Sequence, residues 1–410
     1  MRRCAALAVI LILGIASVTA QRAAAALDAI ALVNASVLNI RTGAIQRGAT
    51  VVLRGGQIEG VSTAAAPAGI RSFDLHNRFV VPGLIDAHVH IASLPQLRAA
   101  LESGVTTVRS AGVSNFADVG MRELVKKGFV AGPDVVAAGY HVRPEIAPEF
   151  FLDFPELGDL MNGVTGADAI RRAVRANLSR GADWIKVLAT ERAGTANTDP
   201  RKQVYSQEEL RILVTEAAGK EIPVMAHAHG AEGADAAVRA GVRSIEHGTY
   251  LSDETLQLMA KQGTYFDPTA DIVNDLTEAG GDYDNAALKR RGEMMRPILK
   301  SAIGKALKFG VKIVTGSDTG YGPNSVARVS REATELVAAG MTPLQALQAA
   351  TIVNAEMLRL DKRTGAVEPG LEADILIVDG NPLDNIRTLL DPLLVISNGR
   401  IGLDRLSFAK

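Results

Sequence analysis

The stretch Val80-Val81-Pro82-Gly83-Leu84-Ile85-Asp86-Ala87-His88-Val89-His90 decides how this chain is interpreted. Its apolar residues predict a strand buried on both faces, and Pro82-Gly83 interrupts the run as a domain junction would. Side chains alternate along a strand, so His88 and His90 lie on one face and can bind one ion together. Two histidines at a strand end are also an ordinary polar terminus, so the interpretation depends on further ligands elsewhere.

The size and charge of the chain narrow the classes of protein. Its 410 residues are enough for one large domain and a smaller one. Lys and Arg number 44 and Asp and Glu number 45, a balance that argues against nucleic acid or an anionic membrane as a partner. Short Val/Ile/Ala runs alternate with Ala/Leu/Glu-rich stretches, which is typical of an α/β enzyme.

The first residues have the pattern of a secretory signal peptide, predicted over 1–20. Arg2-Arg3 supplies a positive start, residues 5–15 are apolar, and Val18-Thr19-Ala20 is a small-residue cleavage site. We expect an exported protein, periplasmic or secreted, with no membrane attachment after cleavage; a retained membrane anchor is the alternative. The one cysteine, Cys4, would be removed with the signal, leaving a mature protein without a thiol.

The two ends of the chain share a composition of short strand-like runs broken by glycine and asparagine. This pattern covers residues 28–81 and returns over residues 363–405. We expect both ends to pair into one composite β-sandwich domain. Two unrelated strand clusters are the alternative.

Between these ends, residues 82–362 contain eight candidate strands that alternate with helical stretches. The strands are a run ending at His90 and runs at 106–109, 135–138, 184–187, 224–227, 244–247, 264–266 and 313–316. Eight such units fit a (β/α)8 TIM-like barrel, whose active site lies at the carboxyl ends of the strands. A doubly wound open sheet is the rival, but no glycine-rich phosphate-binding motif follows the early strands.

Helix signals fall between these strands. Ser206 followed by Glu209 predicts a capping box, and Thr342-Pro343 predicts another helix start. Residues 271–303 are predicted to form a helical insertion after the seventh strand. It either overhangs the site or presents solvated helical surface.

Six metal-binding or titratable residues fall at the predicted strand ends: His88, His90, Lys186, His227, His247 and Asp318. Imidazole and carboxylate groups at such a mouth suit zinc or a similar divalent ion. Lys186 is the unusual member, because an ammonium group would repel the metal. A buried lysine loses its proton more readily, and the neutral amine can add carbon dioxide to become a bridging carbamate. An ion pair of Lys186 with Asp183 or Glu191 is the alternative.

The chain resembles the amidohydrolase superfamily at these positions and beyond them. The matching segments are 82–90, 185–187, 226–230, 245–248, 316–319, 340–344, 349–351 and 370–374. It is similar to the imidazolonepropionase-related branch, which includes Xaa-Pro dipeptidases and ochratoxin-hydrolysing enzymes. The resemblance implies a binuclear centre with two divalent ions, expected to be zinc. His88, His90 and Asp318 would hold the more buried ion, His227 and His247 the more exposed ion, and carboxylated Lys186 would join them.

The resemblance also implies a reaction. The protein would be a hydrolase of carbon–nitrogen bonds that acts on a small molecule, and it would cleave the amide bond of a dipeptide or an N-acyl amino acid. A hydroxide bridging the ions would attack the amide carbon, and Asp318 would pass its proton to the leaving amine. His141 matches the position of a histidine near the scissile carbonyl, where it would stabilise the oxyanion; a structural hydrogen bond is the alternative. His229 is expected to contact substrate or support the metal ligands. A substrate carboxylate would bind one of four further residues: Arg143, Arg192, Tyr321 or Arg328.

Two rival functions remain open from the sequence. The first is a mononuclear deaminase or cyclic-amide hydrolase of the same superfamily. Such deaminases generally have a glutamate just after the fifth-strand histidine, where this chain has Ala228-His229, and do not need a lysine such as Lys186. An inactive structural relative would be expected to have lost some of the six ligands. We expect the protein to form a homo-oligomer.

Overall fold

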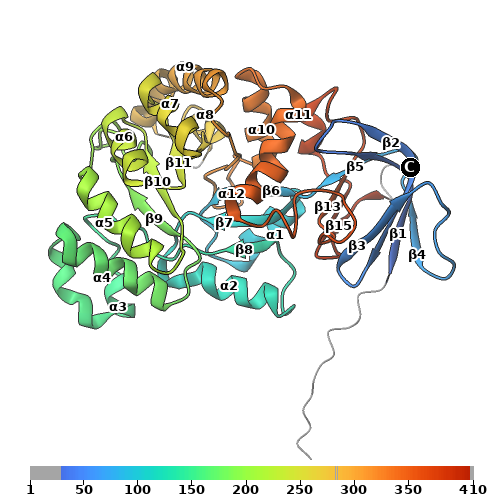
Figure 1. Ribbon diagram of the computed structural model, residues 1–410, viewed down its shortest axis with the longest axis horizontal. Coiled ribbons are helices and arrows are strands. Elements are labelled where there is room, and N and C mark those ends of the chain that lie inside the picture. Colours follow the sequence, from blue (N-terminus) through green and yellow to red (C-terminus); the bar gives the residue numbers. More distant parts are fainter. Residues whose placement is uncertain (1–28, 282, 284, 407–410) are drawn as a thin grey trace, which may run out of the picture.

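The computed structural model describes residues 29–281, 283 and 285–406. The predicted signal segment lies outside them. Strands and helices alternate through the middle of the chain, and strands predominate at its two ends (Figure 1). Within the described part, no helix combines the length and the apolar character that crossing a bilayer requires.

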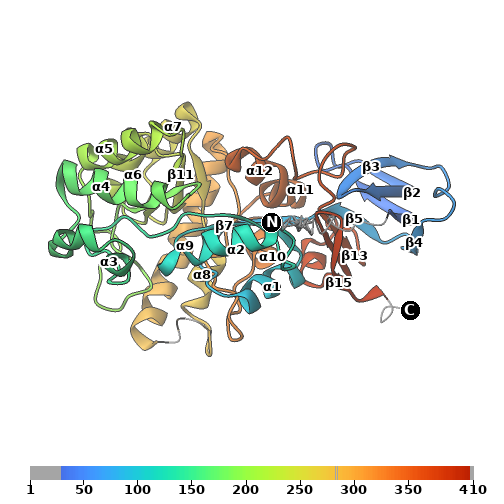
Figure 2. The same ribbon diagram turned by 90° about the horizontal axis from the view of Figure 1, so that it is seen from below.

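Strands from the two ends of the chain form one sheet. Its order is β15-β14-β13-β5-β1-β2-β3, with β4 pairing to β1. Figures 1 and 2 show the blue strands β1 to β4 beside the red strand β13. The packing of two sheets into a sandwich stays a prediction. The strands are β1 (Ile30–Leu38), β2 (Ile45–Arg54), β3 (Gln57–Ser62), β4 (Arg71–Asp74), β5 (Phe79–Pro82), β13 (Ile375–Val378), β14 (Leu394–Ser397) and β15 (Arg400–Asp404).

An apolar core explains why these end segments pair. Leu32 of β1, Val51 of β2 and Ile377 of β13 are fully buried in the same cluster. Burying side chains of this size stabilises the fold by about 1.5–3 kcal/mol each. The strands of both ends therefore depend on each other for a core.

Gly83 separates β5 from the next strand, β6 (Leu84–Val89), which belongs to a different sheet. A Cβ atom at Gly83 would collide with the side chain of Thr106. Its amide donates to the carbonyl of Asp374, 2.9 Å away, close to β13. Glycine is needed here because the chain passes between two packed elements.

The middle of the chain forms two parallel sheets of order β6-β7-β8 and β12-β11-β10-β9. Isolated parallel bridges continue this order, pairing Val142 with Val187, Phe266 with Ile313, and Val89 with Thr319. The parallel α/β arrangement agrees with the prediction. The strands are β7 (Val105–Ser110), β8 (Asp134–Val136), β9 (Ile185–Leu188), β10 (Val224–Ala228), β11 (Ser244–His247) and β12 (Tyr265–Asp267).

The predicted eighth strand, 313–316, differs from the observed structure. This segment forms a single bridge, at Ile313, and has no regular strand; the next bridge along the chain is at Thr319. A Cβ at Gly316 would collide with His88 and Asp267, and Asp318 has a left-handed φ of 52°. The backbone leaves strand geometry where it must pass close to β6 and aim Asp318 inward.

Helices lie outside the parallel strands, and Figure 1 shows α4 to α7 outside β9 to β11. The predicted capping box is present at Ser206 before α5, and the predicted helix start at Thr342-Pro343 also has a capping box, formed by Thr342 and Gln345, before α11. The main helices are α1 (Leu94–Glu102), α2 (Ala117–Lys126), α4 (Gly166–Ser179), α5 (Gln207–Ala218), α6 (Ala231–Ala240), α7 (Asp253–Gln262), α8 (Ala270–Asp275), α9 (Ala286–Phe309), α10 (Val329–Ala338), α11 (Pro343–Gln348) and α12 (Asn354–Leu358).

The predicted insertion over 271–303 is divided between α8 and α9. Ile272, Val273 and Leu276 from α8 and its C-terminal end line the cavity described below, so this part covers the site. Most exposed positions of α9 carry charged side chains, which accounts for the solvated character of the second part.

Candidate metal centre

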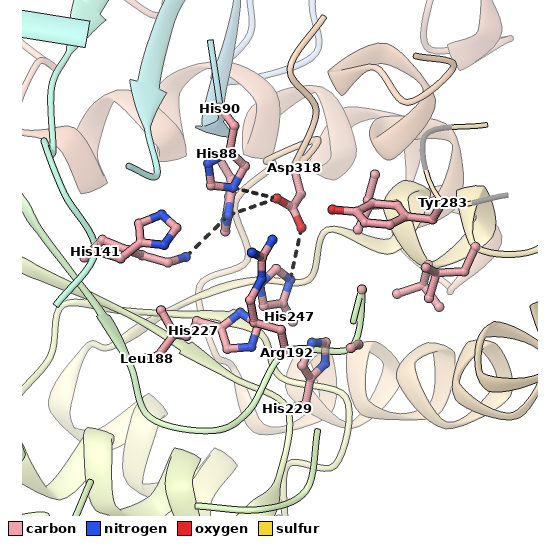
Figure 3. A pocket seen from close by; sticks show the side chains of 16 residues that line it. His88, His90, His141, Leu188, Arg192, His227, His229, His247, Tyr283 and Asp318 are labelled. Carbon is pink, nitrogen blue, oxygen red and sulfur yellow. Dashed lines mark hydrogen bonds and ion pairs between the residues drawn. The ribbon is translucent and has the colours of Figure 1, made fainter. Parts of the chain in front are cut away.

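One cavity brings together the residues that the sequence places at strand ends (Figure 3). All six predicted metal ligands line it. Its other lining residues are His141, Leu188, Arg192, Ala193, Gly194, His229, Ile272, Val273, Leu276 and Tyr283. The wall toward α8 is apolar, and the wall toward the strand ends carries the imidazoles. The cavity therefore has one apolar side and one side of potential metal ligands.

His88 is the most enclosed of these histidines. It is fully buried at the end of β6, and its Nδ1 donates to Glu246 Oε2, 2.8 Å away. Glu246 also accepts from Arg109 Nη2 at 2.8 Å. Burial opposes ionisation of Glu246, but Arg109 and His88 hold its pKa below the ordinary value. The ionised carboxylate orients the ring, so that His88 Nε2 points into the cavity.

Asp318 faces both His88 and His90. Its Oδ1 lies 3.3 Å from His88 Nε2 and 3.0 Å from His90 Nε2, while His90 Nδ1 donates to the carbonyl of Gly112 at 2.8 Å. Burial favours the neutral acid, but the neighbouring imidazoles hold the pKa of Asp318 well below its usual range. Three potential ligand atoms therefore converge with a negative charge among them.

Lys186 is buried in the same group. Its Nζ lies 3.4 Å from His88 Nε2, and burial lowers the pKa of Lys186 to about 8. The alternative ion pairs are absent in the described structure, since Asp183 pairs with Arg122 and Glu191 pairs with Lys202. A lysine with this pKa is partly neutral at physiological pH.

A second group is formed by His227, His229 and His247. Their ligand atoms lie within 4.8 Å of one another, and the rings of His229 and His247 stack at 4.7 Å. Burial lowers the pKa of all three, to about 3 for His229. They are neutral at pH 7, the form that binds metals.

The orientations of the imidazoles fit a metal centre. His227 Nε2 donates to the carbonyl of Glu191 at 3.2 Å, and His247 Nδ1 lies 2.7 Å from Thr269 Oγ1. His88 and His90 are likewise each fixed through Nδ1, and the Nε2 atom of each ring faces Asp318 in the cavity. This is the arrangement that protein ligands of zinc adopt.

The structure places the other predicted site residues differently. His141 lies half-buried on the cavity wall, and its buried Nε2 has no partner among the described residues. Arg192 also lines the cavity, whereas Arg143 does not. Tyr321 is buried away from it, with its hydroxyl donating to Asp86 at 2.8 Å, and Arg328 packs over the Tyr321 ring at 4.9 Å. Tyr321 and Arg328 are therefore not brought to the site.

Three buried charged residues beneath the site escaped the sequence analysis: Arg109, Glu246 and Asp267. Arg109 Nη2 lies 3.7 Å from Asp267 Oδ2 and 2.8 Å from Glu246 Oε2. For Arg109 and Glu246 the signal was available, because charged residues inside predicted buried strands need buried partners.

Known families and solved structures include proteins similar to this chain. Residues 79–402 match the model of the Amidohydrolase family. Ochratoxinase of Aspergillus niger is 28% identical over 358 residues, which covers 77% of this chain and 73% of that protein. A solved Xaa-Pro dipeptidase with methionine in its active site is 27% identical, with a TM-score of 0.80 over 91% of this chain and 99% of that one. A solved putative prolidase from Bifidobacterium longum is 30% identical, with a TM-score of 0.80 over 92% and 95%. The chain thus belongs to the amidohydrolase family and is a hydrolase of carbon–nitrogen bonds.

Proposed function

We propose that the protein is a binuclear metal-dependent amidohydrolase that cleaves the amide bond of a dipeptide or an N-acyl amino acid. The observation that carries the proposal is the convergence of ligand atoms: those of His88, His247 and Asp318 lie within 4.8 Å of one another, beside Lys186 Nζ. The dipeptidase and ochratoxinase similarities support an amide substrate. The bridges between the two parallel sheets support a closed (β/α)8 barrel as the framework.

The residues divide into two ligand sets. His88, His90 and Asp318 would hold one divalent ion, and His227 and His247 the second. The neutral amine of Lys186 would add carbon dioxide, forming a nitrogen–carbon bond and releasing a proton, and its carbamate would reach both sets. Divalent ions bound there would polarise the amide carbonyl and lower the pKa of water.

Asp318 is the proposed proton carrier. Its two oxygens face different histidines, with Oδ1 toward His90 and Oδ2 3.9 Å from His247 Nδ1. Because its pKa lies well below the usual range, the carboxylate is ionised at neutral pH, the form in which a proton carrier starts the reaction. Delivering that proton to the leaving amine needs only hydrogen-bond reach.

Two cavity residues would bind the substrate around the scissile bond. The buried Nε2 of His141, which has no partner among the described residues, would hydrogen-bond to the carbonyl oxygen as negative charge develops there. The guanidinium of Arg192 would bind the carboxylate. The apolar wall of Leu188, Ile272, Val273 and Leu276 would receive an apolar side chain of the substrate. Export from the cytoplasm and assembly into a homo-oligomer are further proposals.

A substrate screen with metal counting tests this function. Zinc-loaded protein is assayed against N-acyl amino acids and against Xaa-Pro, Xaa-Phe and Xaa-Arg dipeptides, and bound metal is measured by elemental analysis. We expect two ions per chain and chelator-sensitive hydrolysis. Lys186→Ala should lose both the bound ions and the activity, because this substitution removes the carbamate. One ion per chain, or full activity of Lys186→Ala with two ions bound, would contradict the binuclear mechanism.

A further inference from the structure

The loop of residues 192–198 forms one wall of the cavity. Arg192, Ala193 and Gly194 line it directly. A Cβ at Gly194 would lie 2.6 Å from Tyr283 Cε1, so the aromatic ring packs on the bare backbone of the loop. The loop contains no helix or strand, and its position must therefore be fixed by contacts from outside.

The Arg192 guanidinium is the feature of this loop that points to a ligand. In the part of the chain that the structure describes, no hydrogen bond or ion pair of this side chain is found, and Figure 3 shows it among the histidines of the cavity. A half-buried cation without a protein partner favours an anionic ligand.

Arg291 of α9 binds this loop without lining the cavity. Its Nη1 donates to the carbonyls of Ala193 and Thr195 at 2.5 and 2.7 Å, and its Nη2 to those of Ala196 and Thr198 at 3.3 and 2.6 Å. All four terminal N–H groups of the guanidinium are thus used on consecutive turns of one loop. Thr198 closes the loop on itself, with its hydroxyl 2.5 Å from the carbonyl of Arg192.

We infer that Arg291 is a positioning residue: by clasping the 192–198 loop it holds Arg192 in the cavity, and the site thereby selects amides that carry a carboxylate. This inference rests on the proposed function. Arg291 is not among the cavity-lining residues. Its N–H groups bind the loop carbonyls, and Arg192 is the arginine that lines the cavity and can bind the substrate. Without the hydrogen bonds from Arg291, substrate binding would have to order the loop and the long Arg192 side chain. The conformational entropy lost in that step would weaken the affinity for substrate.

A matched pair of substrates separates this role from a structural one. The two share the acyl group and the scissile amide, but the leaving amino acid carries either a free carboxylate or a carboxamide. Arg192→Gln should raise KM for the carboxylate substrate by about 10- to 100-fold, as expected for a hydrogen bond to a charged group, and change KM for the carboxamide little. Arg291→Gln should act in the same direction by about 5- to 30-fold, because the loop retains its other contacts.

Three further variants complete the test. The double variant should be no worse than Arg192→Gln alone, since Arg291 acts through Arg192. Arg291→Lys retains the positive charge but loses the planar guanidinium that donates to four loop carbonyls. It should therefore give an intermediate KM for the carboxylate substrate. Arg290→Gln removes the same charge from an exposed neighbour on α9 for which the described structure shows no partner, and should leave both KM values unchanged.

The outcomes are distinguishable. Equal losses of kcat on both substrates in Arg291→Gln, with the thermal midpoint of Arg291→Lys also lowered, would show a structural role and overturn the inference. Additive effects in the double variant would do the same. Turnover by the unmodified protein without preference for the carboxylate would overturn this inference alone, whereas no hydrolysis of any amide in the screen would overturn the proposed function as well.

Discussion

Replacing Glu246 with glutamine should damage both the fold and the metal centre from a position that never touches substrate. The side chain is fully buried, with His88 Nδ1 and Arg109 Nη2 each 2.8 Å from Oε2 and Ser244 Oγ 2.5 Å from Oε1. Glutamine has the same shape, but it lacks the charge. Its amide group can also accept through only one of its two terminal atoms.

The loss of unfolding free energy in Glu246→Gln depends on which ion-pair partner Arg109 still has. Breaking a buried ion pair by neutralising one partner costs about 3–5 kcal/mol. We expect about 3 kcal/mol, the lower end of that range, because Asp267 Oδ2 remains 3.7 Å from Arg109 Nη2. The loss of the carboxylate that orients His88 should separately weaken metal binding by about 10- to 100-fold.

Two measurements check these numbers independently. Urea denaturation of chelator-treated protein gives the free energy of unfolding without metal, and competition with a chromogenic chelator gives the affinity for zinc. Glu208→Gln is the control, since Glu208 pairs with Arg211 at an exposed site and should lose under about 1 kcal/mol. An unchanged unfolding free energy in the metal-free protein, together with an unchanged zinc affinity, would refute the reasoning.

Three further predictions concern other residues. His141→Asn should lower kcat by about 10²- to 10³-fold with little change in KM, measured by steady-state kinetics, because its proposed hydrogen bond forms to the developing oxyanion; an equal rise in KM would argue for ground-state binding instead. Removal of metal by a chelator should abolish activity and lower the thermal midpoint, and zinc with bicarbonate should restore both; a midpoint indifferent to metal would contradict the ligand assignment. Burial raises the pKa of Asp374 to about 7, above its unfolded value, so the folded protein binds the extra proton and loses stability as pH rises from about 4 to 7. Asp374→Asn should flatten that slope, of up to about 1.4 kcal/mol per pH unit, in unfolding curves recorded across this range.

Much of the fold was predictable because local signals agreed with the final structure. The apolar runs before His88, His227 and His247 became buried parallel strands, and the caps at Ser206 and Thr342 began helices where the sequence placed them. Strand alternation and the shared direction of parallel strands were enough to bring these histidines to one cavity.

The remainder depended on contacts between distant segments. Tyr321 follows Asp318 closely in sequence, yet its hydroxyl turns down to the buried carboxylate of Asp86 instead of toward substrate. The segment 313–316 has strand-like residues, but close packing of Gly316 against His88 prevents regular pairing. Arg109 and Glu246 find each other across more than a hundred residues. No local pattern contains the partner of such a group, because only the assembled sheet brings the two segments together.

The shared sheet also sets the order in which this protein can be completed. β5 pairs with β1 on one edge and with β13 on the other, and everything from β6 to α12 is synthesised before β13 appears. A nascent chain on the ribosome therefore carries β5 with one open, apolar edge until its last segment emerges. Such an edge is a template for pairing with other chains. Truncation before Ile375 would make that transient exposure permanent, and the truncated chain should aggregate even though every residue of the metal centre is present.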